Sequence, residues 1–214
     1  MNIYDLIIIG AGPGGYAGAI RAAQLGLKVC VIERRDVGGT CLNRGCIPTK
    51  SFLYASELFS KAKNDFETFG ITAENISFDM AKMYSRKNQT VTRLRSGVEQ
   101  LLKANKVTRL EGTGTIEARG SVKFVSADGT EEILKAENIL IASGSKPSYT
   151  KFPGSDLPGV ITSDELLENS SSVKKKLLVL GGGVIAVEFA SVFANLGCEV
   201  TIAVRLRLMR TWDD

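Results

Sequence analysis

The sequence has no histidine, only four cysteines among 214 residues, and no long apolar run. Without histidine, no imidazole of this chain can act as a general base, bind a metal or complete a Ser-His-Asp triad. Four cysteines are too few for a disulfide-rich scaffold, so any pair of them needs a chemical role. Apolar runs such as residues 6–9 are far too short to span a bilayer, so no membrane partner is expected.

The charges are almost balanced, with 27 basic and 23 acidic side chains and a net charge of +4. No Lys/Arg cluster is dense enough to neutralise a run of phosphates, which argues against a nucleic-acid partner. The apolar share of 44% and the charged share of 23% are typical of folded proteins, and the length suits one domain and part of a second. Residues 1–9 contain Asp5 and lack the basic start of a secretory signal, so we expect a cytoplasmic protein.

The start of the sequence predicts a strand–helix–strand unit. An apolar run at residues 4–9 leads into a glycine-rich stretch, and a helical pattern follows at residues 16–25. A second buried strand is expected at residues 28–33. This order of elements is the context in which a glycine motif binds a dinucleotide.

The glycines of this unit have the spacing that such a site requires. Gly10 permits a tight turn, Gly12 lets the backbone approach a pyrophosphate, and Gly15 allows the helix to pack closely on the strand. The helix N-terminus favours phosphate, and Glu33 at the end of the second strand can accept hydrogen bonds from ribose hydroxyls. The pattern predicts dinucleotide binding, and the alternative is a tight turn without a ligand.

Two cysteines, Cys41 and Cys46, flank a short loop that runs into a helix predicted at residues 46–63. The helix dipole would stabilise a Cys46 thiolate, whereas Cys41 lies outside in the loop. This asymmetry suits a redox pair in which one sulfur stays in the protein and the other attacks a substrate disulfide. Lys50, on the same helix face as Cys46, can bring a positive charge near the thiolate and a ring cofactor.

A zinc site and an inert bridge are the alternatives for this cysteine pair. Zinc needs four ligands, and the only other cysteines are Cys30 and Cys198, which lie in or beside apolar strands. We expect these two residues to belong to the core, and we expect no metal.

The middle of the chain reads as helices and a small sheet. We predict a long helix at residues 79–105, a strand at 107–110, an antiparallel meander at 112–134 and a buried strand at 138–142. The segment 146–159 contains four of the five prolines and reads as a crossover linker.

The opening pattern returns 171 residues later, where a strand at 176–180 enters a turn with Gly181 and Gly183. Ala186 stands in place of the third glycine, and Val204 stands where an acid would bind the ribose of NAD. Arg205 follows, and a cation there can favour the 2′-phosphate of NADP. NAD, NADP and no nucleotide at all remain open for this site, because only two of about five parallel strands fit before the last residue.

The segment 38–50 resembles the active-site signature of the pyridine nucleotide–disulfide oxidoreductases, and its residues 41–50 are most similar to those of members that oxidise dihydrolipoamide. The first glycine unit is similar to that family's FAD-binding start. Residues 111–114 are similar to its stretch near the adenine, 141–147 to its closing segment beside the flavin, and 181–190 to its nicotinamide-nucleotide motif.

The resemblance implies an α/β fold with two parts. Residues 1–145 would form a Rossmann-like FAD-binding domain with a small antiparallel β-meander and the redox-active disulfide. Residues 146–214 would form a linker and the truncated start of a second Rossmann-like NAD(P)-binding domain.

The resemblance also implies roles for single residues. A Cys41–Cys46 disulfide would lie against the flavin, with Cys46 as the thiolate facing the isoalloxazine and Cys41 exchanging with the dithiol of lipoamide. Lys50 would pair with Glu188 near the flavin, and electrons would run from the dithiol through the disulfide and FAD to NAD⁺. Further contacts are implied for FAD at Gly39, Thr40, Gly114, Ser143 and Gly144, and for the nicotinamide dinucleotide at Gly181, Gly183 and Arg205.

Chains of this family are roughly twice as long, judged from usual domain sizes. Their additional part carries a dimer-forming domain and a His–Glu pair that moves the thiol proton, which this histidine-free chain cannot replace. We therefore expect a homodimer in a full-length form, or a complementing chain. The rival readings are an NADPH-dependent reductase of glutathione-like or mercuric substrates, and a non-catalytic FAD-binding fragment or half of a split enzyme.

Overall fold

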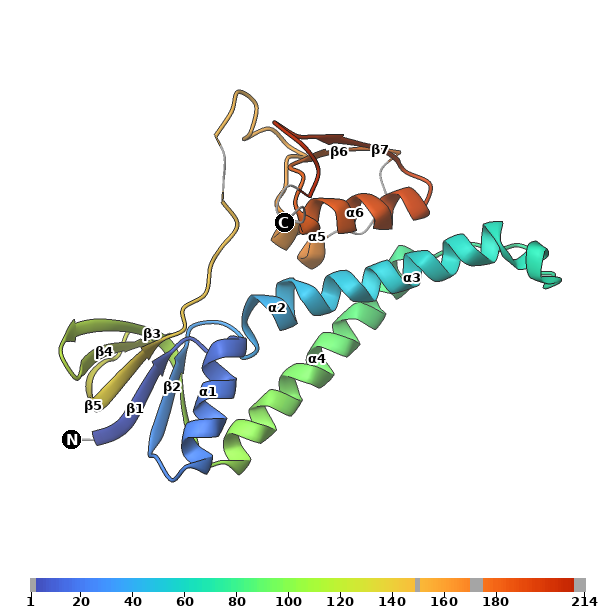
Figure 1. Ribbon diagram of the computed structural model, residues 1–214. Coiled ribbons are helices and arrows are strands. Elements are labelled where there is room, and N and C mark those ends of the chain that lie inside the picture. Colours follow the sequence, from blue (N-terminus) through green and yellow to red (C-terminus); the bar gives the residue numbers. More distant parts are fainter. Residues whose placement is uncertain (1–2, 149–150, 170–174, 210–214) are drawn as a thin grey trace. The chain divides into compact units, whose positions relative to one another are not determined.

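The computed structural model describes residues 3–148, 151–169 and 175–209 (Figure 1). These residues belong to two compact units. The first unit comprises Met1–Cys46 and Val91–Lys146, and the second comprises Ile47–Thr90 and Pro147–Asp214. The boundary predicted between residues 145 and 146 remains a prediction.

The first unit is built on parallel strands joined by a helix. Strand β1 (Ile3–Ile9) leads into helix α1 (Pro13–Gln24), which returns to strand β2 (Val29–Glu33). Strand β1 pairs in parallel with β2, and β2 pairs in parallel with the first part of β3 (Thr108–Ala118). The predicted strand–helix–strand unit is therefore present, and Pro13 begins its helix because the fixed φ of proline suits the first turn.

Strands β3 and β5 (Glu131–Ile141) each have a parallel neighbour on one side and an antiparallel neighbour on the other. Their outer halves pair antiparallel with β4 (Ser121–Ser126), while the last part of β5 pairs in parallel with β1, so that the five strands close into a ring. The separate strands predicted at 107–110 and 138–142 are wrong in this respect, because each is one end of a longer strand. The change of partner in β3 occurs at Gly112, where a Cβ atom would overlap Val125 O.

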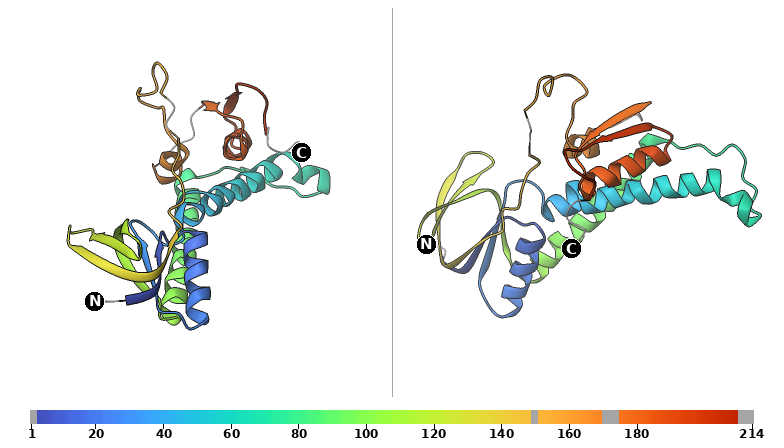
Figure 2. Two further views of the ribbon diagram at one scale, coloured as in Figure 1. Left: turned by 60° about the vertical axis from the view of Figure 1, so that its left-hand side comes forward. Right: turned by 45° about the horizontal axis from the view of Figure 1, so that its top comes forward.

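Helices cover one face of the parallel strands and the meander covers the other. In both views, α1 and the later part of α4 (Met80–Ala104) lie on one side, with β3, β4 and β5 curving away on the other (Figures 1 and 2). The core inside the ring of strands consists of buried side chains from β1, β2, β4 and β5, namely Tyr4, Ile7, Cys30, Ile32, Val122, Phe124, Leu134 and Ala136. The predicted α/β class with an antiparallel meander is confirmed.

The second unit has two parallel strands in its described part. Strands β6 (Lys176–Leu180) and β7 (Glu199–Ala203) are joined by helix α6 (Val184–Asn195), as predicted. Helix α3 (Cys46–Asn64), the short helix η1 (Phe66–Phe69) and helix α5 (Ser163–Asn169) complete the elements, and α5 was not predicted. The core joins α3, α4, α5 and α6 through Phe52, Met80, Leu167, Phe189, Val192, Phe193, Leu196 and Cys198.

Over the described residues, none of the helices combines the length and the apolar content that a bilayer crossing requires.

Candidate functional site

The first glycine turn is closely packed against its neighbours. A Cβ atom on Gly10 would overlap Ala142 O, and one on Gly15 would overlap Gly10 O. A Cβ atom on Gly12 would find nothing nearer than Gly39 Cα at 3.7 Å. The first and third glycines therefore bring strand, turn and helix together, and the second leaves its backbone accessible to a ligand, as a pyrophosphate site needs.

The first turn of α1 contains no acidic side chain of its own. Gly12 caps the helix without a side-chain hydrogen bond. The exposed N–H groups and the helix dipole at such an end favour a phosphate.

Glu33 lies at the end of β2, and its carboxylate accepts a hydrogen bond from the backbone of the first glycine turn. Its Oε2 accepts a hydrogen bond from Ala11 N at 2.8 Å, and its Oε1 accepts one from Arg35 N at 2.9 Å. A carboxylate has about four acceptor positions, so two remain for ribose hydroxyls. The residues of this turn thus fit a bound adenine dinucleotide.

Three further residues of the first unit are predicted to contact FAD. Ser143 and Gly144 follow β5, beside the carbonyl of Ala142 that faces Gly10. Gly114 lies within β3, where a Cβ atom would come to 3.0 Å from Ile32 Cδ1. Ser143 and Gly144 therefore follow directly on a residue that packs against the first glycine turn, and the contacts of all three residues with FAD stay a prediction.

The implied disulfide joins Cys41 to Cys46, with 4.6 Å between the two Cα atoms. Cys46 begins α3, as predicted, but Cys41 does not lie in a loop. It belongs to a short helix, α2 (Gly39–Arg44), together with Gly39 and Thr40. This helix was missed because it has only six residues, too few for a periodic pattern.

Helix α2 is seated directly on the first glycine turn. Gly38 N donates a hydrogen bond to Ala11 O at 2.8 Å, and a Cβ atom on Gly39 would lie 2.6 Å from Gly12 Cα. The backbone of Ala11 is thus held on both sides, because its N–H donates to Glu33 and its carbonyl accepts from Gly38 N. Helix α2, which carries Cys41, is therefore bound directly to the first glycine turn. The role of Ala11 was not visible in the sequence because it acts through its backbone alone.

Lys50 and Glu188 form an ion pair within the second unit. Lys50 Nζ lies 3.0 Å from Glu188 Oε1, with side-chain exposures of 63% and 20%. Lys50 comes from α3 and Glu188 from α6, 138 residues apart in the sequence. The structure brings the two residues together, and their role beside a flavin stays a prediction.

The second glycine turn repeats the backbone contacts of the first at a constant offset. Gly181 N donates to Ala203 O as Gly10 N donates to Ile32 O, and Met209 N donates to Gly182 O as Gly38 N donates to Ala11 O. Met209 even adopts the positive φ of Gly38, at 53° against 92°. The repeat therefore includes the returning turn, which the sequence comparison of glycines and strands did not reveal.

This repeat fixes which residue of the second turn corresponds to Glu33. Because Ala203 corresponds to Ile32, Val204 occupies the position of Glu33 and offers no carboxylate. Arg205 follows it and is exposed. Gly183 caps α6 without a side chain, so this helix N-terminus has the same open character as that of α1.

The two remaining cysteines are buried, as expected. Cys30 has no exposed surface, and burial raises the pKa of its thiol to about 12. Burial also raises the pKa of the Cys198 thiol. Both sulfurs therefore remain protonated at neutral pH, which makes them poor nucleophiles.

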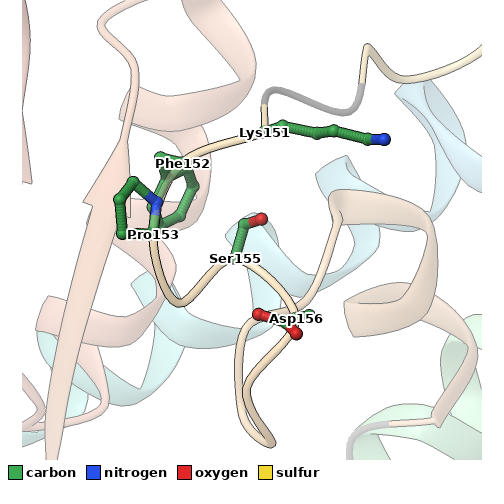
Figure 3. Close-up of a pocket in the computed structure, with 5 residues that line it drawn as sticks. All are labelled: Lys151, Phe152, Pro153, Ser155 and Asp156. Atoms are coloured by element: carbon green, nitrogen blue, oxygen red, sulfur yellow. The ribbon is translucent and has the colours of Figure 1, made fainter.

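A separate hollow of about 530 Å³ lies on the segment before α5. Its lining consists of Lys151, Phe152, Pro153, Ser155 and Asp156 (Figure 3). It contains none of the predicted site residues. Within the described residues, no group of cysteine, aspartate and glutamate side chains has the arrangement of a metal site.

The fold and the site together define a class: a dinucleotide-binding α/β unit with a disulfide built against its phosphate turn. Comparison with known families agrees, because residues 4–214 match the model described as pyridine nucleotide-disulphide oxidoreductase. The chain belongs to this family.

Several curated relatives carry the name dihydrolipoyl dehydrogenase. The chain is 43% identical over 203 residues to that of Trypanosoma brucei brucei, with 94% of this chain and 42% of the relative covered. It is 46% identical over 205 residues to the mitochondrial protein of Caenorhabditis elegans, with 92% of this chain and 40% of the relative covered. The protein named dihydrolipoyl dehydrogenase 3 of Pseudomonas putida is 43% identical over 210 residues. The chain thus spans about two fifths of the length of these relatives.

Proposed function

We propose that this chain forms the FAD-binding and disulfide-bearing part of a dihydrolipoyl dehydrogenase, which oxidises dihydrolipoamide and reduces NAD⁺. The observation that carries the proposal is the seating of α2, with Cys41, on the first glycine turn. The relatives described above, which are 43% to 46% identical and carry the name dihydrolipoyl dehydrogenase, support the substrate class.

FAD is the cofactor proposed for the first unit. When bound, it supplies an acceptor for two electrons. Gly12 and the N-terminus of α1 would hold its pyrophosphate, and Glu33 its ribose. The other residues proposed to contact it are Gly10, Gly15, Gly39, Thr40, Lys50, Gly114, Ser143 and Gly144.

The cysteines perform the thiol chemistry. A thiolate of dihydrolipoamide attacks Cys41 Sγ, the Cys41–Cys46 bond breaks, and Cys46 leaves as the thiolate. The second substrate thiol then attacks the sulfur that is bonded to Cys41, which releases lipoamide and the Cys41 thiol. Cys46 is the better leaving group because it begins α3, where the helix dipole stabilises its negative charge.

The second turn is proposed to bind the nicotinamide nucleotide through Gly181, Gly183 and Arg205, with Lys50 and Glu188 held as a pair beside the flavin. NAD is the nucleotide proposed, because the resemblance of residues 38–50 to members that oxidise dihydrolipoamide implies it. NADP is the second candidate, because Val204 replaces the ribose-binding acid and Arg205 adds a cation. Reduction assays with each nucleotide at equal concentration would decide between them.

Turnover also requires a base for the substrate thiols, and this chain contains no histidine. We propose that a longer form or a second polypeptide supplies it, in a dimer, and that the protein acts in the cytoplasm. The mass of the native assembly tests this proposal, and a monomer of this chain alone that turns over lipoamide would refute it.

The flavin spectrum tests the central proposal. We expect Cys41→Ser to show a long-wavelength band from the Cys46 thiolate next to oxidised flavin, and Cys46→Ser to lack it. A band in Cys46→Ser alone would reverse the two roles. A protein that fails to bind FAD at all would instead support a role outside flavin catalysis, and activity restricted to NADPH with glutathione-like disulfides would favour the reductase reading.

A further inference from the structure

The residues between the two cysteines reach back to the turn that precedes them. Asn43 Nδ2 donates hydrogen bonds to Val37 O and Gly39 O, both at 2.9 Å. Arg44 Nη1 lies 3.1 Å from Asp36 Oδ2. Both side chains of α2 that follow Leu42 therefore hold the segment 36–39.

The Arg44–Asp36 pair is partly buried and is supported from a third element. The Arg44 side chain is only 10% exposed, so solvent screens this pair less than an ordinary surface ion pair. Asp36 Oδ1 also accepts from Arg95 of α4 at 2.6 Å. The carboxylate is thus fixed by two arginines, one on α2 and one on the long helix.

Helix α2 needs such support because it is weak on its own. It has six residues, its N-cap Gly38 supplies no side-chain hydrogen bond, and Gly45 ends it. A helix this short is unstable in isolation, since nucleation is costly and few hydrogen bonds follow. When the disulfide is opened, Cys41 and Cys46 remain five residues apart in the chain, and noncovalent contacts alone then hold this segment in the helical conformation that brings the two sulfurs together.

We propose that Asn43, Arg44 and Asp36 form a clamp, here called the α2 clamp, that keeps the two cysteines at bonding distance in the dithiol state. Asn43 and Arg44 are then positioning residues for the redox pair. The proposal rests on the proposed function only in assuming that the pair is reduced and reoxidised during turnover.

Removing the α2 clamp shifts the redox equilibrium because it destabilises the disulfide form and the dithiol form by unequal amounts. In the oxidised protein the disulfide holds α2, so a clamp variant loses the full contact energy. In the reduced protein α2 can instead become disordered, which recovers chain entropy and offsets part of that loss. Removing the clamp therefore weakens the disulfide relative to the dithiol.

The experiment equilibrates the protein with glutathione, in the reaction of protein dithiol and glutathione disulfide to give protein disulfide and two glutathione thiols. The oxidised fraction is read by alkylation and mass analysis of the peptide with both cysteines. We expect the equilibrium constant to fall about fivefold in Arg44→Met, a shift of about 20 mV to less negative potential. Asp36→Asn, which keeps the side-chain shape, should shift it in the same direction.

Arg109→Met is the matched control, because Arg109 pairs with Glu99 and Glu111 elsewhere in the first unit. It should leave the equilibrium constant unchanged. If Arg44→Met and Asp36→Asn lower the unfolding free energy but leave the equilibrium constant as in wild type, their role is only structural and the proposal is overturned.

Hydrogen exchange gives a second readout. Reduction should leave the deuterium uptake of the α2 peptide unchanged in the wild-type protein and raise it in Arg44→Met, with no change in the β1 peptide. Equal uptake in both reduced proteins would overturn the clamp. Neither readout involves FAD or lipoamide, so a failure of the proposed function leaves both results interpretable.

Discussion

Replacing Gly39 with alanine tests whether the contact between α2 and the first glycine turn determines cofactor affinity. Gly39 has a φ of 61°, and a Cβ atom there would lie 2.6 Å from Gly12 Cα. A left-handed conformation costs an alanine about 1–2 kcal/mol. Carbon atoms prefer separations of about 3.5–4.0 Å, so the two backbones would also have to move apart by about 1 Å.

This displacement should open the pyrophosphate position at Gly12. We expect Gly39→Ala to weaken FAD binding at least about tenfold, which corresponds to about 1.4 kcal/mol. The measurement is a fluorescence titration of the deflavinated protein with FAD, accompanied by urea unfolding to obtain the stability change.

Gly129→Ala provides the control for backbone strain. Gly129 has a φ of 86°, and a Cβ atom there would meet nothing within 4 Å. It should lose a similar stability of about 1–2 kcal/mol and bind FAD as the wild type does. Wild-type FAD affinity in Gly39→Ala, or an equal loss in both variants, would refute the argument.

Three further predictions concern the cores and buried charges. Because the pKa of Cys30 is raised to about 12, the folded protein keeps a thiol proton that the unfolded chain loses above pH 9, so stability falls as the pH rises. Between pH 8 and 10 the loss in urea unfolding should be about 1.4 kcal/mol larger in the wild-type protein than in Cys30→Ala; equal losses would contradict it. Burial lowers the pKa of Lys87, so between that pKa and the ordinary value of 10.5 the unfolded chain holds the extra proton and stability rises with pH. Lys87→Met should lack this rise when unfolding is compared at neutral and alkaline pH, and a persisting rise would assign it elsewhere. Leu134 is 1% exposed, whereas its neighbour Ile133 is 42% exposed. Leu134→Ala should therefore lower the unfolding free energy by about 2–5 kcal/mol and Ile133→Ala by much less. Similar losses in both variants would argue against the core inside the ring of strands.

The parts predicted well from sequence are those where one local pattern determines the outcome. The turn from Gly10 to Gly15 was recognised because glycine spacing, an apolar strand before it and a helix after it all agree. The Cys41–Cys46 disulfide came from the resemblance rather than from spacing alone, and the structure contains it.

The parts that were missed depend on contacts between distant segments. Helix α2 was taken for a loop because six residues carry no periodic signal. It is held by Asp36, whose carboxylate is fixed by Arg95, 59 residues away. The length of β3 was missed because its pattern changes at Gly112, where the strand exchanges a parallel partner for an antiparallel one. No local signal in a sequence states which strand lies beside which.

The closed ring of strands has a consequence for synthesis of the protein. Strand β1 lies between β2 and β5, and the pair of Ile3 with Lys135 shows how far β5 is from β1 in the sequence. One edge of β1 must therefore stay unpaired until the ribosome has made the chain as far as Lys135, because its second neighbour does not exist before then. Contacts between such distant residues slow folding. They also leave the unpaired N–H and C=O groups of β1 exposed to pairing with other chains, so the nascent chain should depend on a chaperone until β5 emerges.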